Sequence, residues 1–168
     1  ELEEFLLAGD VERADEVLCT YYDSVLDDVR ETIIAAFPQR AKVLVKAFEA
    51  HTRGDYELSV PVLLVQADGI AQESIRIGLY QKKNGEPATR SYVDNLSADG
   101  FMSGFLEPLR LALPLTAPTA SRGGAPVGLN RHQVLHGESV EYGTKKFSLQ
   151  AISLVAYVVW VLGEREDH

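Results

Sequence analysis

Apolar residues recur at intervals of three and four along most of this chain, and this spacing constrains its fold more than any other feature. From Val11 to Ile33 the apolar positions form one stripe, while acidic side chains fill the opposite face. The pattern predicts a single long amphipathic helix. Asp10 can cap the start of this helix, and Pro38 ends it because proline cannot continue the hydrogen-bond ladder.

Further helical segments follow, separated by turns and loops. Residues 82–87 predict a turn at a helix–loop–helix junction, although a short strand on either side of this turn is compatible with the sequence. Residues 112–128 hold three prolines and three glycines, which predicts a long loop, and a second loop is expected at 137–144. A second helix is predicted to follow Pro38 and to end near residue 54. The next helix is predicted to begin at Pro61 and to span 62–79. Further helices are predicted at 88–97, 101–111, the short segment 129–136, and 147–162.

These segments show no alternation of strands with helices. The sequence therefore predicts an all-α fold, a compact helical bundle of about five to seven helices. A length of 168 residues suits one domain, which we divide into an acidic N-terminal helical part, residues 1–38, and a core, residues 39–162. The chain opens with Glu1 and not with methionine, so we expect a fragment of a longer protein.

Charge and cysteine content narrow the function classes. The net charge is −9, and residues 1–60 hold 14 acidic and 6 basic side chains. This acidity argues against non-specific nucleic-acid binding but leaves room for a local basic site in the second half. The lone Cys19 excludes an intramolecular disulfide framework and fits a reducing compartment.

Membrane association is not expected. The apolar run 147–162 is shorter than the roughly 20 residues that a membrane span needs, so it predicts a buried helix. The N-terminal residues have neither the basic nor the apolar region of a signal peptide. The sequence therefore predicts a cytoplasmic protein.

The residues best suited to chemistry cluster at 130–137, with the sequence Asn-Arg-His-Gln-Val-Leu-His-Gly. One interpretation is a metal site. His132 and His136 lie four apart and so share one helical face, where Glu138 or Glu141 could add a ligand. Because closed metal sites use about four ligands, we predict no metal and no cofactor.

The second interpretation is metal-independent phosphoryl chemistry. Cleavage of RNA by its own 2′-hydroxyl needs a base that titrates near neutral pH and a cation for the phosphate, and histidine and arginine supply these. On a regular helix Arg131 and His136 would lie about 140° apart around the axis and about 7–8 Å along it. A tight pair needs a long arginine reach, a distortion near Gly137, or a second protomer. The same residues can also serve a structural role by bonding neighbouring helix ends.

Arg131-His132, three further residues and His136 resemble the Arg-polar-x(3–5)-His signature of the HEPN superfamily. The resemblance extends to the flanking blocks and covers roughly residues 40–162. These blocks look like those of uncharacterised bacterial HEPN-like proteins, and they are residues 58–70, 129–137, 142–144 and 148–154.

The resemblance implies a helical bundle that forms a homodimer with the motif helices facing each other. It also implies a metal-independent endoribonuclease of bacterial toxin–antitoxin or phage-defence systems, with RNA and an antitoxin or other protein as partners. Carried over, Arg131 would stabilise the scissile phosphate, and His136 would act as general base or acid. His132 and Asn130 would support them. A tyrosine follows the motif histidine by two residues in one branch of the family, and here that residue is Glu138.

Five other side chains are candidates for RNA contact or for support of the motif. Asp68 and Glu73 can bond to the motif or lie on a solvated stripe, and Tyr142 can stack on a base or pack beside the loop. Lys145 and Lys146 can follow an RNA backbone. Four more basic residues have the same potential: Lys82, Lys83, Arg90 and Arg122.

An alternative function is a catalytically silent HEPN-like domain. Such a domain would dimerise or bind a partner, and it would regulate that partner or a missing N-terminal module. The acidic N-terminal part favours this alternative.

Overall fold

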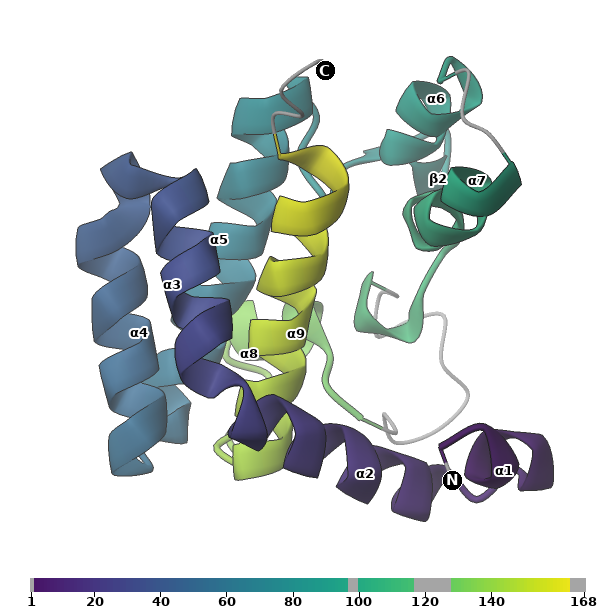
Figure 1. Cartoon of the computed structure of the whole chain (residues 1–168). Helices are drawn as coiled ribbons and strands as arrows, with labels where there is room; N and C mark the ends of the chain where they lie inside the picture. Colours follow the sequence, from purple (N-terminus) through teal and green to yellow (C-terminus); the bar gives the residue numbers. More distant parts are fainter. Residues whose placement is uncertain (1, 97–99, 117–127, 164–168) are drawn as a thin grey trace.

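The computed structural model describes residues 2–96, 100–116 and 128–163, and most of this part is helical (Figure 1). The all-α prediction is confirmed. The α-helices are α1 (Leu2–Ala8), α2 (Val11–Ser24), α3 (Leu26–Ala36), α4 (Ala41–Arg53), α5 (Tyr56–Ile75), α6 (Thr89–Asp94), α7 (Gly100–Leu106), α8 (Arg131–Leu135) and α9 (Lys145–Leu162). The 3₁₀ turns are η1 (Pro38–Arg40), η2 (Glu107–Leu109) and η3 (Pro114–Thr116), and one small hairpin joins β1 (Lys82–Lys83) to β2 (Glu86–Pro87).

The predicted continuous helix from Val11 to Ile33 is wrong, because it is interrupted at Val25. The Ser24 hydroxyl donates to the carbonyl of Tyr21 at 2.7 Å, and this carbonyl also accepts the Val25 N–H at 3.2 Å. Serine side chains compete with the helix backbone in this way. Together with α1, which the spacing did not predict, the break brings the described residues to nine α-helices, more than the expected number.

Helix α5 begins earlier than predicted. Pro61 lies inside the helix and not in its first turn, since the helix begins at Tyr56. The helix ends at Ile75, where Arg76 adopts a left-handed conformation with φ 59°. The turn at 82–87 is confirmed, and it carries the two short strands that the sequence left open.

Four helices form the centre of the fold. Helix α5 packs along both α9 and α4, and α3 contacts α4 and α9, so the four lie side by side (Figure 1). Each fully buried aliphatic side chain contributes about 1.5–3 kcal/mol by leaving water. The largest fully buried residues of this core are Phe48, Ile33, Leu44, Leu63, Leu64, Ile70, Leu149 and Ile152.

Helix α9 has the length and composition of a candidate membrane span. Half of its residues are buried inside the protein, against α2, α3 and α5. A core helix of this kind is expected to be apolar on most of its circumference.

One arginine joins η1 to α5. The Arg40 guanidinium forms an ion pair with Glu73 at 2.8 Å and donates to the Gln66 side chain at 3.1 Å and to the Gly69 carbonyl at 2.8 Å. A Cβ at residue 69 would lie 2.6 Å from Arg40 Nη1. Glycine at this position therefore makes room for the guanidinium of Arg40, whose side chain is only 22% exposed.

A chain of buried polar side chains crosses the helix interfaces. His51 Nδ1 is hydrogen bonded to the Ser148 hydroxyl at 2.7 Å, and Ser148 is bonded to the Ser59 hydroxyl at 2.6 Å. All three residues are buried. Burial lowers the pKa of His51 below its ordinary value. The three side chains therefore link α4, α5 and α9 through a neutral imidazole.

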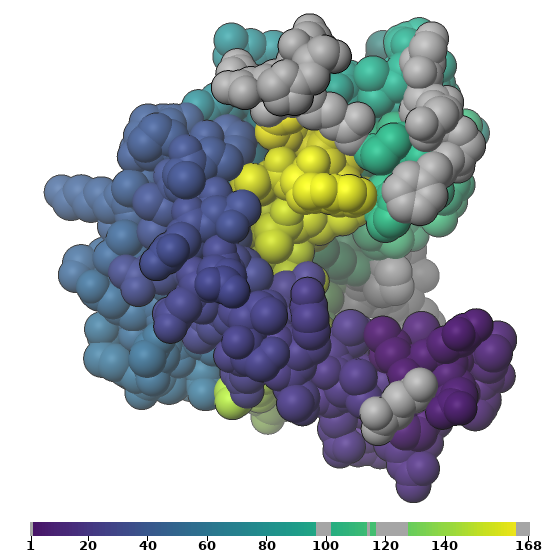
Figure 2. Space-filling view, viewed as in Figure 1, coloured from purple at the N-terminus to yellow at the C-terminus, as the bar shows by residue number. Residues whose placement is uncertain are grey.

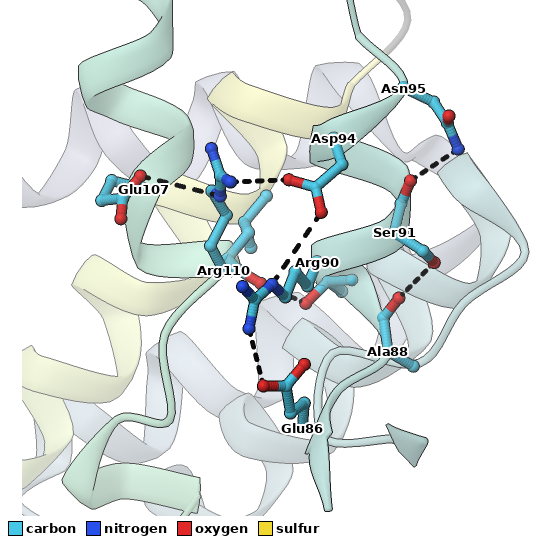
Figure 3. A network of polar contacts seen from close by, with 10 residues as sticks. Glu86, Ala88, Arg90, Ser91, Asp94, Asn95, Glu107 and Arg110 are labelled. Atoms are coloured by element: carbon cyan, nitrogen blue, oxygen red, sulfur yellow. Dashed lines mark hydrogen bonds and ion pairs between the residues drawn. The ribbon is translucent and has the colours of Figure 1, made fainter. Parts of the chain in front are cut away.

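Ion pairs hold α6 against η2 at one end of the molecule (Figure 3). Asp94 lies between Arg90 and Arg110, which also pair with Glu86 and Glu107 (Figure 3). Arg90, a candidate for RNA contact, is thus engaged within the protein.

Helix α7 contacts α9 through one aromatic residue. The Phe105 ring meets Trp160 edge to face at 4.7 Å, and the Tyr157 hydroxyl donates to the Phe105 carbonyl at 2.7 Å. These contacts attach the peripheral helices to the C-terminal half of α9.

Candidate functional site

The sequence cluster 130–137 forms α8, a short helix that packs on α5. Asn130 is its N-cap, and its side chain accepts the Gln133 N–H at 3.0 Å. Val134 is buried and anchors the helix in the core. Gly137 has φ 70°, a conformation that glycine adopts without strain at the end of a helix. Asn130 therefore fixes the start of α8, and its predicted role in support of the motif stays a prediction.

The two motif histidines lie against each other. The ring centroids of His132 and His136 are 4.3 Å apart, with 51° between the ring planes. Glu138 Oε1 lies 3.3 Å from His132 Nε2 and so orients that ring. His136 is exposed. The structure thus brings both imidazoles and the Glu138 carboxylate together. From the sequence Glu138 was a candidate only as a metal ligand, and its ion-pair contact with His132 was not predicted.

Arg131 points to different neighbours. Its guanidinium carbon lies 4.8 Å from the centroid of the Tyr80 ring. Within the described part of the chain, its buried Nε has no hydrogen-bond partner. Tyr80 is fixed in turn, since its hydroxyl donates to the Leu64 carbonyl at 3.0 Å and its N–H donates to Asp68 Oδ1 at 3.1 Å. Burial raises the pKa of Tyr80, so the ring faces Arg131 as a neutral phenol.

Arg131 and His136 do not pair with each other in the described structure, and neither a long reach of the arginine nor a distortion near Gly137 brings them together. In residues 2–96, 100–116 and 128–163, no hydrogen bond joins the two side chains, and each has other neighbours. The spacing explains this, because residues five apart on a helix face about 140° away from each other.

A groove lies between α8 and the start of α9, with a volume of about 630 Å³. Its wall includes Gln133 and Glu138 on the side of α8, and Tyr142 and Phe147 on the other side. Aromatic rings beside amide and carboxylate groups can stack on a base and accept hydrogen bonds from its edge. Glu138, which contacts His132, lines this groove, so the groove reaches the residue that orients one of the two histidines.

Tyr142, predicted to contact a base or pack beside the loop, also completes α5. Pro61 has no N–H, so the Glu57 carbonyl four residues earlier loses its donor. The Tyr142 hydroxyl donates to that carbonyl at 3.3 Å. This contact ties the loop that follows the histidines to the N-terminal turns of α5.

Replacing Tyr142 with phenylalanine is expected to lower the free energy of unfolding by about 0.5–1 kcal/mol, the net value of one hydrogen bond. In a Pro61→Ala background residue 61 regains its N–H, so the same replacement should have a smaller effect. Urea unfolding of the four proteins in this double-mutant cycle measures the coupling. Equal losses in both backgrounds would show that the hydroxyl does not substitute for the missing donor.

The remaining candidates have partners elsewhere. Glu73 pairs with Arg40, whereas Asp68 reaches the motif indirectly, through Tyr80. Lys145 pairs with Asp23 at 2.5 Å, and that carboxylate raises the pKa of Lys145. Lys146 pairs with Asp15. Arg122 lies outside the described residues.

A search of the described residues finds no group of three or more His, Cys, Asp or Glu side chains arranged to hold a metal ion. His132 and His136 lie together, as their spacing predicts, and Glu138 pairs with His132.

The fold and the site define an all-α protein with a histidine pair at the end of a short helix. No protein-family model matches the chain, and comparison with curated proteins and solved structures finds no match either.

Proposed function

We propose that this protein is a metal-independent endoribonuclease of the HEPN type that acts as a homodimer. The observation that carries the proposal is the contact between His132 and His136, beside a groove whose wall includes Glu138. Two neighbouring imidazoles can supply the base and the acid of RNA cleavage without a metal. A role in bacterial toxin–antitoxin or phage-defence systems is proposed on the sequence resemblance alone.

In the proposed reaction one imidazole removes the proton of an RNA 2′-hydroxyl. The 2′-oxygen attacks the adjacent phosphorus, and the bond from phosphorus to the next 5′-oxygen breaks. The second imidazole gives a proton to that leaving oxygen. The products are a 2′,3′-cyclic phosphate and a 5′-hydroxyl. His136, which is exposed, carries out one of these two proton transfers. His132, which Glu138 orients, carries out the other.

Arg131 would stabilise the negative charge on the phosphate oxygens. Since Arg131 and His136 of one protomer have different neighbours, we propose that Arg131 of a second protomer completes each site. Exposed apolar side chains support such pairing. Leu58 and Val65 share the outer face of α5, and Leu135 and Val140 lie on α8 and the loop after it. Uncovered apolar groups of this kind mark protein contacts when they form one patch.

Replacing His136 with alanine is expected to slow RNA cleavage by about 100-fold or more, the usual contribution of a general acid or base. Arg131→Ala should cause a similar loss, and Arg131→Lys should restore little because lysine lacks the planar fork. The substrate is a mixed pool of structured and single-stranded RNA in the presence of EDTA, and product ends are mapped.

Lys42→Ala, on an exposed position of α4, is the matched control and should cleave at the wild-type rate. Light scattering of each sample measures whether the protein is a dimer. Cleavage at the wild-type rate by His136→Ala would refute the role of the histidine. An inactive wild-type protein that is folded and dimeric would refute the nuclease proposal.

One observation favours the alternative of a silent interaction domain. The Arg131 side chain lies on Tyr80 and is not near His136, an arrangement that suits a structural role for the arginine. If Arg131→Ala unfolds the protein and no variant cleaves RNA, this alternative accounts for the motif.

A further inference from the structure

The first turn of α9 concentrates positive charge. It begins at Thr144, whose hydroxyl accepts the Phe147 N–H at 3.2 Å, and continues with Lys145 and Lys146, with no acidic residue in the turn. The N-terminus of a helix carries a partial positive charge, so lysines at this end are unfavourable unless anions lie nearby. This turn needs an anionic partner.

Helix α2 supplies that partner from another part of the chain. Asp23 pairs with Lys145 at 2.5 Å, and Asp15 pairs with Lys146. Two carboxylates from one helix thus meet two consecutive lysines. Each carboxylate occupies the place that a phosphate oxygen of a bound polyanion would take, because both groups accept the same charge-assisted hydrogen bonds from lysine.

The helix that carries these carboxylates is weakly attached. Ala14 is its one buried residue, only Cys19 and Tyr22 of α2 are partly buried against the core, and α1 has no buried residue. The helical segment is interrupted at Val25, and α3 begins after this residue without a side-chain cap. In Figure 2 the purple N-terminal end of the segment formed by α1 and α2 projects from the body of the molecule. Elements with few buried apolar contacts open at low free-energy cost.

The arm formed by α1 and α2 also holds most of the protein's charge imbalance. Residues 1–24 contain eight acidic side chains and one basic side chain. If this arm moved away from the rest of the protein, the start of α9 would therefore lose a large negative electrostatic field. Polyanion binding and arm docking thus oppose each other.

We propose that α2 is a displaceable acidic cover over an RNA-binding surface formed by Lys145 and Lys146. Asp15 and Asp23 hold the lysines while the arm is docked, and a phosphodiester backbone takes their place when the arm leaves. This regulation rests on the proposed nuclease function, because it controls RNA access beside the histidine site. The groove next to α8 and the first turn of α9 share Thr144 and Phe147, so the two surfaces are continuous.

The test uses the full chain and measures binding without cleavage. Its probe is a fluorescein-labelled oligouridylate with 2′-O-methyl groups, which cannot be cut through the 2′-oxygen. The variant Asp15→Asn/Asp23→Asn removes both pairs, and Glu12→Gln/Glu16→Gln is the matched control. The control changes two exposed acids of the same helix and alters the net charge by the same amount.

We expect the Asp15→Asn/Asp23→Asn protein to bind about tenfold more tightly than wild type at roughly 0.15 M salt, from two added phosphate contacts on single-stranded RNA. The slope of log affinity against log salt should steepen by about 1.4. The control should change affinity less than about twofold, and adding Lys145→Ala/Lys146→Ala to the asparagine variant should abolish its gain. Circular dichroism verifies that each variant keeps its helices.

Equal gains in RNA affinity in the asparagine variant and in the control would overturn the proposal of a cover, since the change in net charge alone would then explain both gains. Absence of binding in every protein would overturn it as well. If the gain occurs but no protein cleaves unmodified RNA, the cover stands and the nuclease proposal fails. If the protein cleaves unmodified RNA but the asparagine variant gains no more affinity than the control, the nuclease proposal stands and the proposed cover fails.

Discussion

Replacing Arg40 with alanine is expected to lower the free energy of unfolding by about 2–3 kcal/mol, since the change leaves partly buried acceptors without their donor. The variant removes the arginine donor from the Glu73 carboxylate, which keeps its contact with Gln39, and from the Gln66 amide oxygen and the Gly69 carbonyl. It also leaves a hole beside Gly69, which has no side chain to fill it. The measurement is urea unfolding followed by circular dichroism.

The matched control is Arg53→Ala. Arg53 pairs with Asp55 at 2.9 Å, but both side chains are about half exposed. An exposed pair contributes less than about 1 kcal/mol. Similar losses in the two variants would mean that the Arg40 network stabilises no more than a surface ion pair. A Gly69→Ala variant gives a second measurement, because its methyl group would displace the guanidinium without removing the charge.

Acid should destabilise the protein through His51. Burial lowers the pKa of this imidazole, so the unfolded chain binds a proton at a higher pH than the folded protein does. Stability from the neutral side chain is therefore complete above the ordinary histidine pKa of about 6.5 and falls as the pH drops below it, by up to about 1.4 kcal/mol per pH unit. The fall ends when the pH passes the folded-state pKa. Unfolding free energies measured between pH 7.5 and 5 at about 0.15 M salt give this slope.

The variant His51→Asn isolates this effect. An asparagine amide nitrogen can occupy the position of Nδ1 and keep a hydrogen bond to Ser148, but it does not titrate. We expect the variant to lose most of the stability change in this pH range. His132→Asn, at a half-exposed position, is the control and should retain the wild-type slope. A slope unchanged in His51→Asn would show that other groups cause the acid sensitivity.

The central helices could be predicted because burial decides them. The apolar spacing of α4 records the face that it buries, and α5 and α9 are apolar around most of their circumference, as expected of helices at the centre of a core. The break at Val25 could not be predicted in the same way. The apolar stripe continues through Tyr21 and Val29, and the interruption depends on a local bond from Ser24 that leaves no trace in the hydrophobic pattern.

The site was predicted in part. Spacing of four correctly brought His132 and His136 together, whereas the N-cap role of Asn130 was not predicted, although its residue type is typical of that position. Tyr80 was missed because it lies outside any periodic segment, and only the packing of α8 on α5 brings Arg131 over its ring. Asp68 and Glu73 were grouped as candidates, yet five positions on a helix turn them about 140° apart. One therefore supports Tyr80 and the other holds Arg40.

The contact of α7 with α9 gives the protein an optical reporter of its own. Trp160 is the single tryptophan of the chain, it is 52% exposed, and its ring meets the edge of Phe105. Its fluorescence emission therefore depends on whether α7 is docked, whereas far-ultraviolet dichroism is dominated by the long helices α4, α5 and α9. Undocking of the peripheral helices and melting of the bundle can be followed separately, in one unlabelled sample.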